Sequence, residues 1–256
     1  MKQSFLKYEK PPLTVMVQAE TPNRIEELMT AALPNGAEAF GMQFCKLRPE
    51  YRTPEIYKSL FEKASPLPTY VTNYRGGYNK GVATDGEIAE ALVTLAECGA
   101  TLIDVMGDLF DKQDDEMAKS PEAVEMQMRL ISRLHSIGAE VLISSHIKKF
   151  TPAERVLEIA LEHKRRGADI SKIVVGADTL DEQIENLRII RLLKEKLDIP
   201  FLLLSGGKSR IVRRFGAELG CCMYLCVAEH DSLATPAQPL LSEVKAIRDG
   251  GAWISE

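Results

Sequence analysis

The chain has 256 residues, is 45% hydrophobic, and carries a formal net charge of −5 with a pI near 5.6. This length suits one large domain or two small ones. The net negative charge argues against a nucleic-acid-binding protein, which would usually carry a surplus of basic residues. No run approaches the ~18 apolar residues that a membrane-spanning helix needs, and residues 1–6 lack the apolar core of a signal peptide. We therefore expect a cytoplasmic protein without nucleic-acid or membrane partners.

Strands and helices alternate along the chain. Short apolar runs rich in β-forming residues predict strands, and segments with helical periodicity predict the helices between them. In chain order, successive strand and helix pairs are expected at 13–17 and 24–33, 37–44 and 53–63, 68–72 and 86–98, 101–106 and 120–137, 140–145 and 151–166, 171–176 and 181–197, 200–205 and 209–219, and 221–227 and 242–249. Cap-plus-proline pairs begin the helices after Thr21 and Thr53, and Thr151 with Glu154 forms a capping-box pattern.

Eight strand–helix pairs in about 250 residues are the number that a (β/α)8 TIM barrel requires. Several predicted helices end in Gly-Ala directly before the next strand, which gives the alternation a regular spacing. The alternative α/β fold, a doubly wound sheet, should carry a glycine-rich fingerprint after its first strand, where this chain has Gln18, Ala19 and Glu20. We predict a single (β/α)8 barrel domain over residues 1–256.

The five cysteines match no metal-binding pattern. Three of them crowd one apolar run, and no histidine lies at ligand spacing, so the arrangement fits no zinc signature. We expect buried, reduced thiols and no metal. The cysteines are Cys45, Cys98, Cys221, Cys222 and Cys226.

Lys172 lies in the run ISKIVV at residues 170–175, which is typical of a buried central strand. Burial disfavours a charged amine, so the ammonium must find a partner or its pKa must fall below the usual ~10.4. A neutral amine of this kind is what an enzyme needs to form a Schiff base with a carbonyl substrate. On this strand alone, the alternative is a structural lysine that pairs with a carboxylate or reaches water at the strand end.

The active sites of such barrels lie at the carboxyl ends of the strands. His146 follows the fifth predicted strand and Lys172 lies on the sixth, so we expect both side chains to face one cavity. A histidine titrates near neutrality and can carry protons to and from an imine intermediate. We interpret His146 as a general acid and base; without Lys172 beside it, it would be an ordinary polar residue at a helix start.

Two groups near the strand ends are candidates to bind an anion. Ser205, two glycines and Lys208 follow the seventh predicted strand and resemble a phosphate cradle, while the nearby Arg213 and Arg214 also suit a carboxylate. Arg75, after the third strand, is the second candidate, with a plain surface arginine as the alternative.

An acidic loop follows the fourth predicted strand. It contains Asp111, Asp114, Asp115 and Glu116, whose spacing matches no calcium loop. We interpret these carboxylates as a solvated surface without a bound metal.

Several pieces of the chain together resemble type I 3-dehydroquinate dehydratase. One piece joins His146, the FTP of residues 150–152 and the ADISKI of residues 168–173. A second is ATPAQ at residues 234–238, where the family usually reads SAPGQ. A third is PTYVTNYR at residues 68–75, which resembles the family's third strand and its substrate arginine. Their order and spacing span nearly the whole chain.

The resemblance implies a homodimeric (β/α)8 enzyme of the shikimate pathway of aromatic amino acid biosynthesis. In that family a lysine forms an imine with the 3-keto group of 3-dehydroquinate, a histidine serves as general acid and base, and loss of water gives 3-dehydroshikimate. Carried over, Lys172 is the imine lysine and His146 is the proton shuttle. Such a carbon–oxygen lyase needs no cofactor, because the lysine itself supplies the electron sink.

The same resemblance implies the contacts to the keto-acid substrate. Arg214, or Arg213 if the gap falls otherwise, resembles the arginine that binds the substrate carboxylate. Gln238 resembles a glutamine that contacts substrate, and Arg75 and Ser205 complete the expected set.

Several positions depart from the family pattern. The second strand normally ends in Glu-x-Arg, which binds substrate hydroxyls, where this chain reads GMQ at residues 41–43. The fourth strand normally carries Asp-x-Glu, whose glutamate orients the histidine, where this chain has Asp104 and Met106. Asp104 and Asp108 are the candidates to replace that glutamate, and the late-loop serine is Ala234. We therefore expect a divergent member that acts on dehydroquinate or on a less hydroxylated keto acid.

Two other functions fit the same residues. A class I aldolase-like enzyme would use Lys172 on a phosphorylated aldehyde or ketone and hold the phosphate at residues 205–208. A non-catalytic protein that binds a metabolite would keep the lysine without its reaction, since Met106 leaves His146 without its usual carboxylate. A phosphate or sulfate bound at the amides of residues 205–208 favours the aldolase, and a carboxylate held by Arg214 favours the dehydratase.

Overall fold

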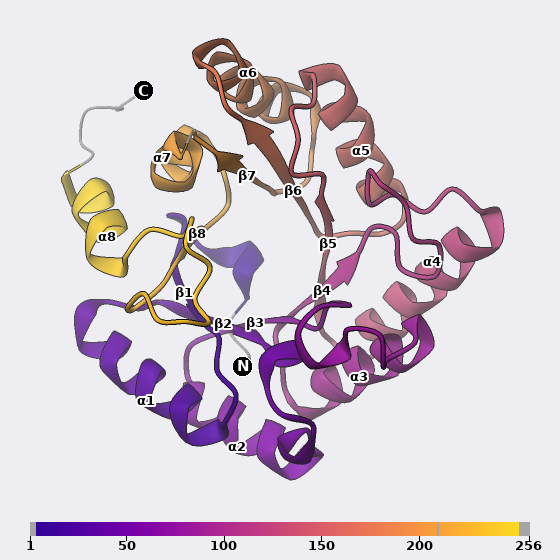
Figure 1. The fold of residues 1–256 in the computed structure, drawn as a ribbon, viewed down its shortest axis with the longest axis vertical. Coiled ribbons are helices and arrows are strands. Elements are labelled where there is room, and N and C mark those ends of the chain that lie inside the picture. Colours follow the sequence, from indigo (N-terminus) through magenta and orange to yellow (C-terminus); the bar gives the residue numbers. More distant parts are fainter. Residues whose placement is uncertain (1–3, 209, 251–256) are drawn as a thin grey trace.

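The computed structural model describes residues 4–208 and 210–250, which form one eight-stranded sheet with helices around it. The strands are β1 (Leu13–Val17), β2 (Ala39–Gln43), β3 (Thr69–Thr72), β4 (Leu102–Met106), β5 (Glu140–His146), β6 (Ile170–Ala177), β7 (Phe201–Gly207) and β8 (Tyr224–Cys226). The α-helices are α1 (Pro22–Ala32), α2 (Pro54–Ala64), α3 (Asp85–Cys98), α4 (Pro121–Ser136), α5 (Ala153–Arg165), α6 (Leu180–Lys196), α7 (Ile211–Leu219) and α8 (Leu241–Gly250). Figure 1 shows the strands at the centre and the helices outside them.

All neighbouring strands are parallel, in the order β7-β6-β5-β4-β3-β2-β1-β8. The last strand thus returns to lie beside the first, which rolls the sheet around a central core. No ladder of backbone hydrogen bonds joins β7 to β8 in the described part of the chain. The predicted (β/α)8 fold is confirmed, and each predicted strand and helix forms with its ends shifted by a few residues. No helix among the described residues combines the length and apolar character that a membrane crossing requires.

Side-chain caps begin several of the helices. Thr21 and Thr53 each accept a hydrogen bond at the start of α1 and α2 and each precedes a proline, as predicted. The capping box predicted at Thr151 is wrong, because its hydroxyl turns back to the carbonyl of Lys149. The first amide of α5 donates instead to the carboxylate of Glu185, at 2.8 Å, so a neighbouring helix supplies the cap.

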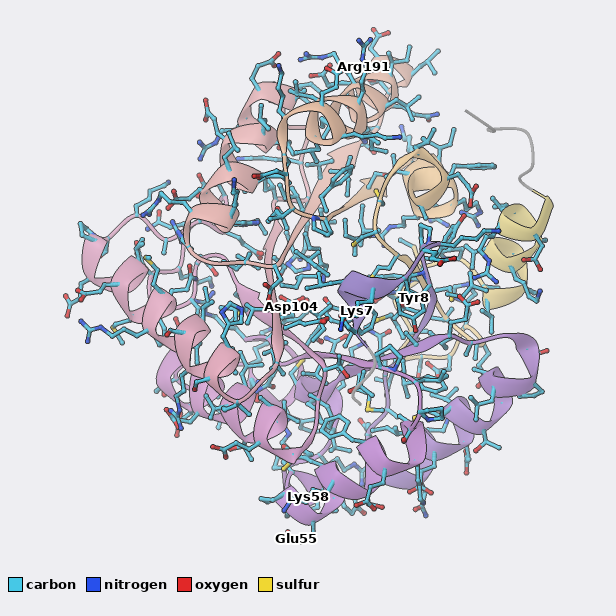
Figure 2. All side chains as sticks on the ribbon, turned by 180° about the vertical axis from the view of Figure 1, so that it is seen from behind. Lys7, Tyr8, Glu55, Lys58, Asp104 and Arg191 are labelled. Atoms are coloured by element: carbon cyan, nitrogen blue, oxygen red, sulfur yellow. The ribbon has the colours of Figure 1, made fainter. Side chains whose placement is uncertain are left out.

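The amino-terminal segment closes the barrel opposite the carboxyl ends of the strands. Its short 3-10 helix η1 (Phe5–Lys7) places the Phe5 ring in the same buried cluster as Leu142 in the barrel interior. The Phe5 amide donates to the carboxylate of Glu140, the first residue of β5, at 3.0 Å. Figure 2, seen from behind, shows Lys7 near the middle of this face. The barrel therefore has a sealed rear end, and its carboxyl-end mouth carries the site.

Alternation along the strands decides which side chains enter the barrel. Ser144 on β5 is the register partner of both Met106 on β4 and Lys172 on β6, so these side chains share one level of the interior. His146 lies two residues beyond Ser144, on the same face of β5 and nearer the mouth. The sequence pattern therefore directs Lys172 and His146 toward one space, as predicted for adjacent barrel strands.

Candidate active site

Lys172 is only 4% exposed, yet its ammonium has a full set of hydrogen-bond partners. Nζ donates to Tyr70 Oη at 2.8 Å, to Tyr74 Oη at 2.9 Å and to Asp104 Oδ2 at 3.1 Å. All three donors of an ammonium are therefore used. Lys172 also lines the large cavity at the barrel mouth, so pairing with a carboxylate and access to a ligand occur together.

Asp104 is the buried counter-ion of this lysine, and Figure 2 shows it in the interior of the molecule. Its Oδ1 accepts from the hydroxyl of Ser144 at 2.5 Å, and its Oδ2 accepts from both phenols. Burial alone would raise the pKa of Asp104, but the charge of Lys172 and the hydrogen bonds from Ser144 and Tyr70 bring it below its ordinary value. The carboxylate thus stays ionised and balances a positive charge on the lysine nitrogen.

His146 is oriented by Glu116, which comes from the loop between β4 and α4. Nδ1 lies 3.0 Å from Glu116 Oε2, and the same oxygen accepts the backbone amide of His146 at 2.5 Å. An ionised carboxylate can only accept, so it fixes the proton on Nδ1 and leaves the lone pair of a neutral ring on Nε2. Two expectations are therefore wrong: Glu116 is not simply solvated surface, and Asp104 and Asp108 do not replace the missing strand glutamate.

The surroundings of His146, burial above all, favour a neutral ring. Burial, together with the positive charge of Lys172, lowers the pKa of His146, while the hydrogen bond and charge of Glu116 oppose that shift. Burial alone would raise the pKa of Glu116, but the hydrogen bonds from the ring and the backbone amide of His146 bring it below its ordinary value. Near neutral pH the site therefore holds a neutral imidazole that is able to accept a proton.

A buried arginine holds the loop that carries Glu116. Arg166, directly after α5, donates to the carbonyls of Gly107 and Ala118 at 3.0 and 2.8 Å, on either side of Glu116 in the loop. The Ser145 hydroxyl donates to the Glu116 carbonyl at 2.9 Å. These bonds hold Glu116 at a φ of 47°, a left-handed conformation that costs a non-glycine residue on the order of 1 kcal/mol. Sequence reasoning missed Glu116 because only this packing brings it to a histidine 30 residues away.

A cavity of about 640 Å³ opens at the barrel mouth, a volume that suits a small-molecule ligand. Of the predicted site residues, it brings together Lys172, His146, Arg75, Arg213 and Gln238. Arg214 and Ser205 are not part of its wall. Other lining residues include Met16, Gln18, Gln43, Thr72, Tyr74, Met106, Glu116, Leu204, Leu225 and Thr235.

Arg213 and Arg214 are adjacent in sequence but have different surroundings. Arg213 is 8% exposed, lines the cavity and donates from Nε to the Ser205 carbonyl at 2.6 Å. Burial, with the nearby charge of Arg210, lowers the pKa of Arg213 to about 10, and no carboxylate among the described residues pairs with it. Arg214 instead forms an ion pair with Glu243 at 3.0 Å. Of the two arginines, Arg213 therefore lies in the cavity wall, whereas Arg214, which the sequence favoured, does not.

The predicted phosphate cradle at residues 205–208 is largely part of a strand and does not form the expected loop. β7 continues through Gly207, so Ser205 and both glycines belong to the strand, and Ser205 is fully buried. The amide of Lys208 donates to a carboxylate oxygen of Asp178 at 3.1 Å. An amide that already donates to a carboxylate is a poor ligand for phosphate. This contact argues against the hypothesis of an aldolase-like phosphate site in this segment.

Arg75 lines the cavity, but two carboxylates already balance its charge. Its guanidinium donates to Asp85 through Nε and Nη2, and to Asp108 through Nη1, each at 2.7 Å. Nη2 also donates to the Asp108 carbonyl at 2.8 Å. We therefore interpret Arg75 as a tie between the loops that follow β3 and β4, in place of the free substrate arginine expected from the sequence.

Neutral polar groups form another part of the cavity wall. Gln18 Nε2 donates to Gln43 Oε1 at 2.5 Å and to Thr235 Oγ1 at 3.2 Å. Thr72 Oγ1 and Gln238 Oε1 are buried and have no hydrogen-bond partner within the described part of the chain. Buried polar atoms are usually paired, so these two oxygens are exceptions within this wall.

Known proteins share this sequence and fold. A family model described as type I 3-dehydroquinase matches residues 57–249, which is well over half of the chain. The chain belongs to the type I 3-dehydroquinase family. The resemblance noted in the sequence is thereby confirmed, although four family positions have changed.

Curated members of the family share moderate identity with this chain. The 3-dehydroquinate dehydratase of Alkaliphilus oremlandii is 33% identical over 141 residues, which cover 54% of this chain and 53% of that protein. The 3-dehydroquinate dehydratase of Geobacillus thermodenitrificans is 27% identical over 184 residues, which cover 71% of this chain and 66% of that protein. The chain thus spans about half to two thirds of the length of these relatives.

Solved structures of the family share the fold over nearly the full length. Type I 3-dehydroquinate dehydratase from Clostridium difficile, with covalent modified comenic acid, superposes with a TM-score of 0.79 at 18% identity and covers 97% of this chain and 98% of that chain. The Geobacillus kaustophilus enzyme gives a TM-score of 0.80 at 16% identity, with 98% and 95% covered. These likenesses establish the common barrel.

At the end of β2, where the resemblance noted in the sequence implies a charged clamp, this chain has a tight apolar contact and an amide. A Cβ added at Gly41 would lie 2.1 Å from the sulfur of Met16, so Met16 occupies the space of a side chain at that position. Gln43 takes part in the neutral amide pair, and Met106 lines the wall where the family has its strand glutamate. The 3-dehydroquinase pocket of this chain is therefore less charged than the family pattern implies.

No metal centre accompanies this pocket in residues 4–208 and 210–250, where no group of three or more His, Cys, Asp or Glu side chains could hold an ion. The five cysteines are free thiols. Burial raises the pKa of Cys221 to about 12, which leaves it an unreactive thiol at neutral pH.

Proposed function

We propose that this chain dehydrates 3-dehydroquinate or a related cyclic keto acid through an imine on Lys172, with His146 as general acid and base. The observation that carries the proposal is the buried amine of Lys172 in the wall of one cavity with an imidazole that a carboxylate orients. Membership of the type I 3-dehydroquinase family supports it.

The charge arrangement suits each stage of an imine reaction. Asp104 balances one positive charge at Nζ, and both the resting ammonium and a protonated imine carry that charge. The imine withdraws electrons from the adjacent carbon, whose proton His146 Nε2 can accept. The same imidazole, once protonated, can return the proton to a hydroxyl that leaves one carbon further along, and water is lost. The lysine provides the electron sink, so we propose no cofactor.

The pocket fits a carboxylate with neutral hydroxyl groups. Arg213 offers a buried cation without a carboxylate partner among the described residues. Thr72 and Gln238 supply neutral polar side chains to the same cavity wall. We propose that the substrate carboxylate lies at Arg213, and that a keto acid with fewer hydroxyls than 3-dehydroquinate is also accepted, because the charged clamp on β2 is absent.

Borohydride trapping tests this function directly. Incubation of the protein with 3-dehydroquinate and sodium borohydride should leave a reduced adduct on the peptide that contains Lys172, detected by mass spectrometry. Absorbance of the enone product should rise in a parallel reaction without borohydride. Failure to trap 3-dehydroquinate, or any cyclic keto acid that differs from it by a hydroxyl, would rule out the proposal.

Arg213 and Arg214 provide a matched test of substrate binding. Arg213→Met should raise KM about 10- to 50-fold and leave kcat within a fewfold, because a charged hydrogen bond made in both ground and transition states is lost. Arg214→Met also removes one positive charge, but from a side chain outside the cavity wall, and should leave KM nearly unchanged. Steady-state kinetics with 3-dehydroquinate give both constants, and a larger effect at Arg214 would reverse the assignment.

We also propose that the enzyme works in the cytoplasm as a homodimer. The five unpaired thiols suit a reducing compartment. The dimer is the assembly that the family resemblance implies, and sedimentation of the purified chain measures it.

A further inference from the structure

Imine formation requires a carrier for two protons. The ammonium of Lys172 has three N–H groups, and a protonated imine keeps one. Condensation with a ketone therefore removes two hydrogens from Nζ, and both end on the carbonyl oxygen that departs as water. A group that touches both Nζ and the substrate oxygen is needed to move them.

Three acceptors surround Nζ, and one of them also faces the ligand. Asp104 and Tyr70 are buried and do not belong to the cavity wall. Tyr74 lines the cavity, and its Oη lies 2.9 Å from Nζ. Its ring packs edge-on against the ring of His146, with 5.2 Å between the centroids. Tyr74 therefore bridges the lysine and the space in which a ketone would sit.

We propose that Tyr74 is a catalytic residue that relays two protons from Nζ of Lys172 to the carbonyl oxygen of the substrate. This inference rests on the proposed function. In each relay the phenol oxygen accepts an N–H proton and gives its own O–H proton to the substrate oxygen, so Tyr74 is neutral before and after.

The two transfers account for every atom and charge. The first accompanies formation of the C–N bond and converts the carbonyl into a hydroxyl on a carbon that bears a protonated amine. The second converts that hydroxyl into water, which leaves as the nitrogen lone pair forms the C=N bond. One positive charge stands at the nitrogen at the start and at the end, beside the carboxylate of Asp104.

The surroundings of the phenol suit a relay. Burial, with the charge of Asp104, raises the pKa of Tyr74 well above its ordinary value, so the phenol keeps its proton and does not compete with His146 as a base. Oδ2 of Asp104 accepts from Tyr70, Tyr74 and Lys172 together, which exceeds the two lone pairs of one oxygen. The Tyr74 O–H can therefore turn to a substrate oxygen while the carboxylate stays satisfied.

Tyr70 supplies the matched control, because its phenol contacts the same lysine and carboxylate but lies outside the cavity wall. Quenched-flow borohydride trapping with 3-dehydroquinate measures the rate of imine formation on Lys172. We expect Tyr74→Phe to slow this rate about 30-fold, since water replaces only part of a positioned proton carrier. Tyr70→Phe should slow it less than about fivefold, the effect of one neutral hydrogen bond.

A solvent isotope measurement adds a readout that a structural role would not move. Imine formation in the wild-type protein should be slower in D2O, and Tyr74→Phe should lose most of that effect; thermal melts check that both variants fold. Equal slowing by the two variants, or a wild-type rate for Tyr74→Phe, overturns the relay while the trapped adduct still supports the proposed function. No adduct in the wild-type protein overturns both.

Discussion

Replacing Lys172 with methionine is expected to abolish both covalent trapping and turnover. Methionine keeps the length of the side chain but has no amine, so no imine and no electron sink can form. We expect the rate of dehydration to fall roughly 10⁴-fold or more. Mass spectrometry after borohydride treatment with 3-dehydroquinate should show unmodified protein, and an adduct at another lysine would show that the imine forms elsewhere.

The same substitution is expected to destabilise the fold through Asp104. That carboxylate is 1% exposed, and loss of the ammonium leaves it buried without its charge partner. Breaking a buried pair in this way costs about 3–5 kcal/mol in the free energy of unfolding. The double variant Lys172→Met with Asp104→Asn should recover part of that loss but no activity. Urea denaturation of the three proteins separates the stability effect from the chemical one.

Replacing Glu116 with glutamine is expected to lower kcat about 10²-fold or more, because the imidazole loses the group that fixes its tautomer and orientation. Glu116 raises the pKa of His146 against the effects of burial and of Lys172. Without it the pKa falls further, so the acidic limb of the pH profile should move to lower pH as the maximum rate drops. Rate profiles across pH 4–9, which bracket histidine titration, measure both changes.

Asp114→Asn is the control for this experiment, since it removes one negative charge from the same loop at an exposed position. Its activity and pH profile should match those of the wild-type protein. If Glu116→Gln also kept the wild-type profile, His146 would not depend on Glu116, and the orienting role of that carboxylate would be contradicted.

The fold was predictable because its signals are local and repeat along the chain. Apolar runs and helix caps mark each strand–helix pair, and eight such pairs lead to a barrel. The inward direction of Lys172 also follows from this pattern, since the strand period alone sets it. The predicted capping box at Thr151 failed because an acidic side chain on a neighbouring helix supplied the cap.

The part of the site that the strand pattern predicted directly is the part that lies on strands. Lys172 and His146 lie on strands. Glu116 instead lies in the loop after β4, whose path depends on Arg166, a residue that directly follows α5. The choice between Arg213 and Arg214 depends on the rotation of α7, which periodicity alone did not fix. Nothing in the sequence pattern singled out Tyr70 and Tyr74, and their contacts to the lysine appear only in three dimensions.

The packing of Phe5 at the rear end of the barrel has a kinetic consequence. Phe5 packs at one end of the barrel and the cavity with Lys172 opens at the other, so we expect the product to leave by the mouth that admits the substrate. Dehydration product added in excess should therefore compete with substrate for the free enzyme and raise the apparent KM without changing the limiting velocity. Shorter side chains at the rim of the cavity mouth are expected to raise the rate constants for substrate binding and for product release together.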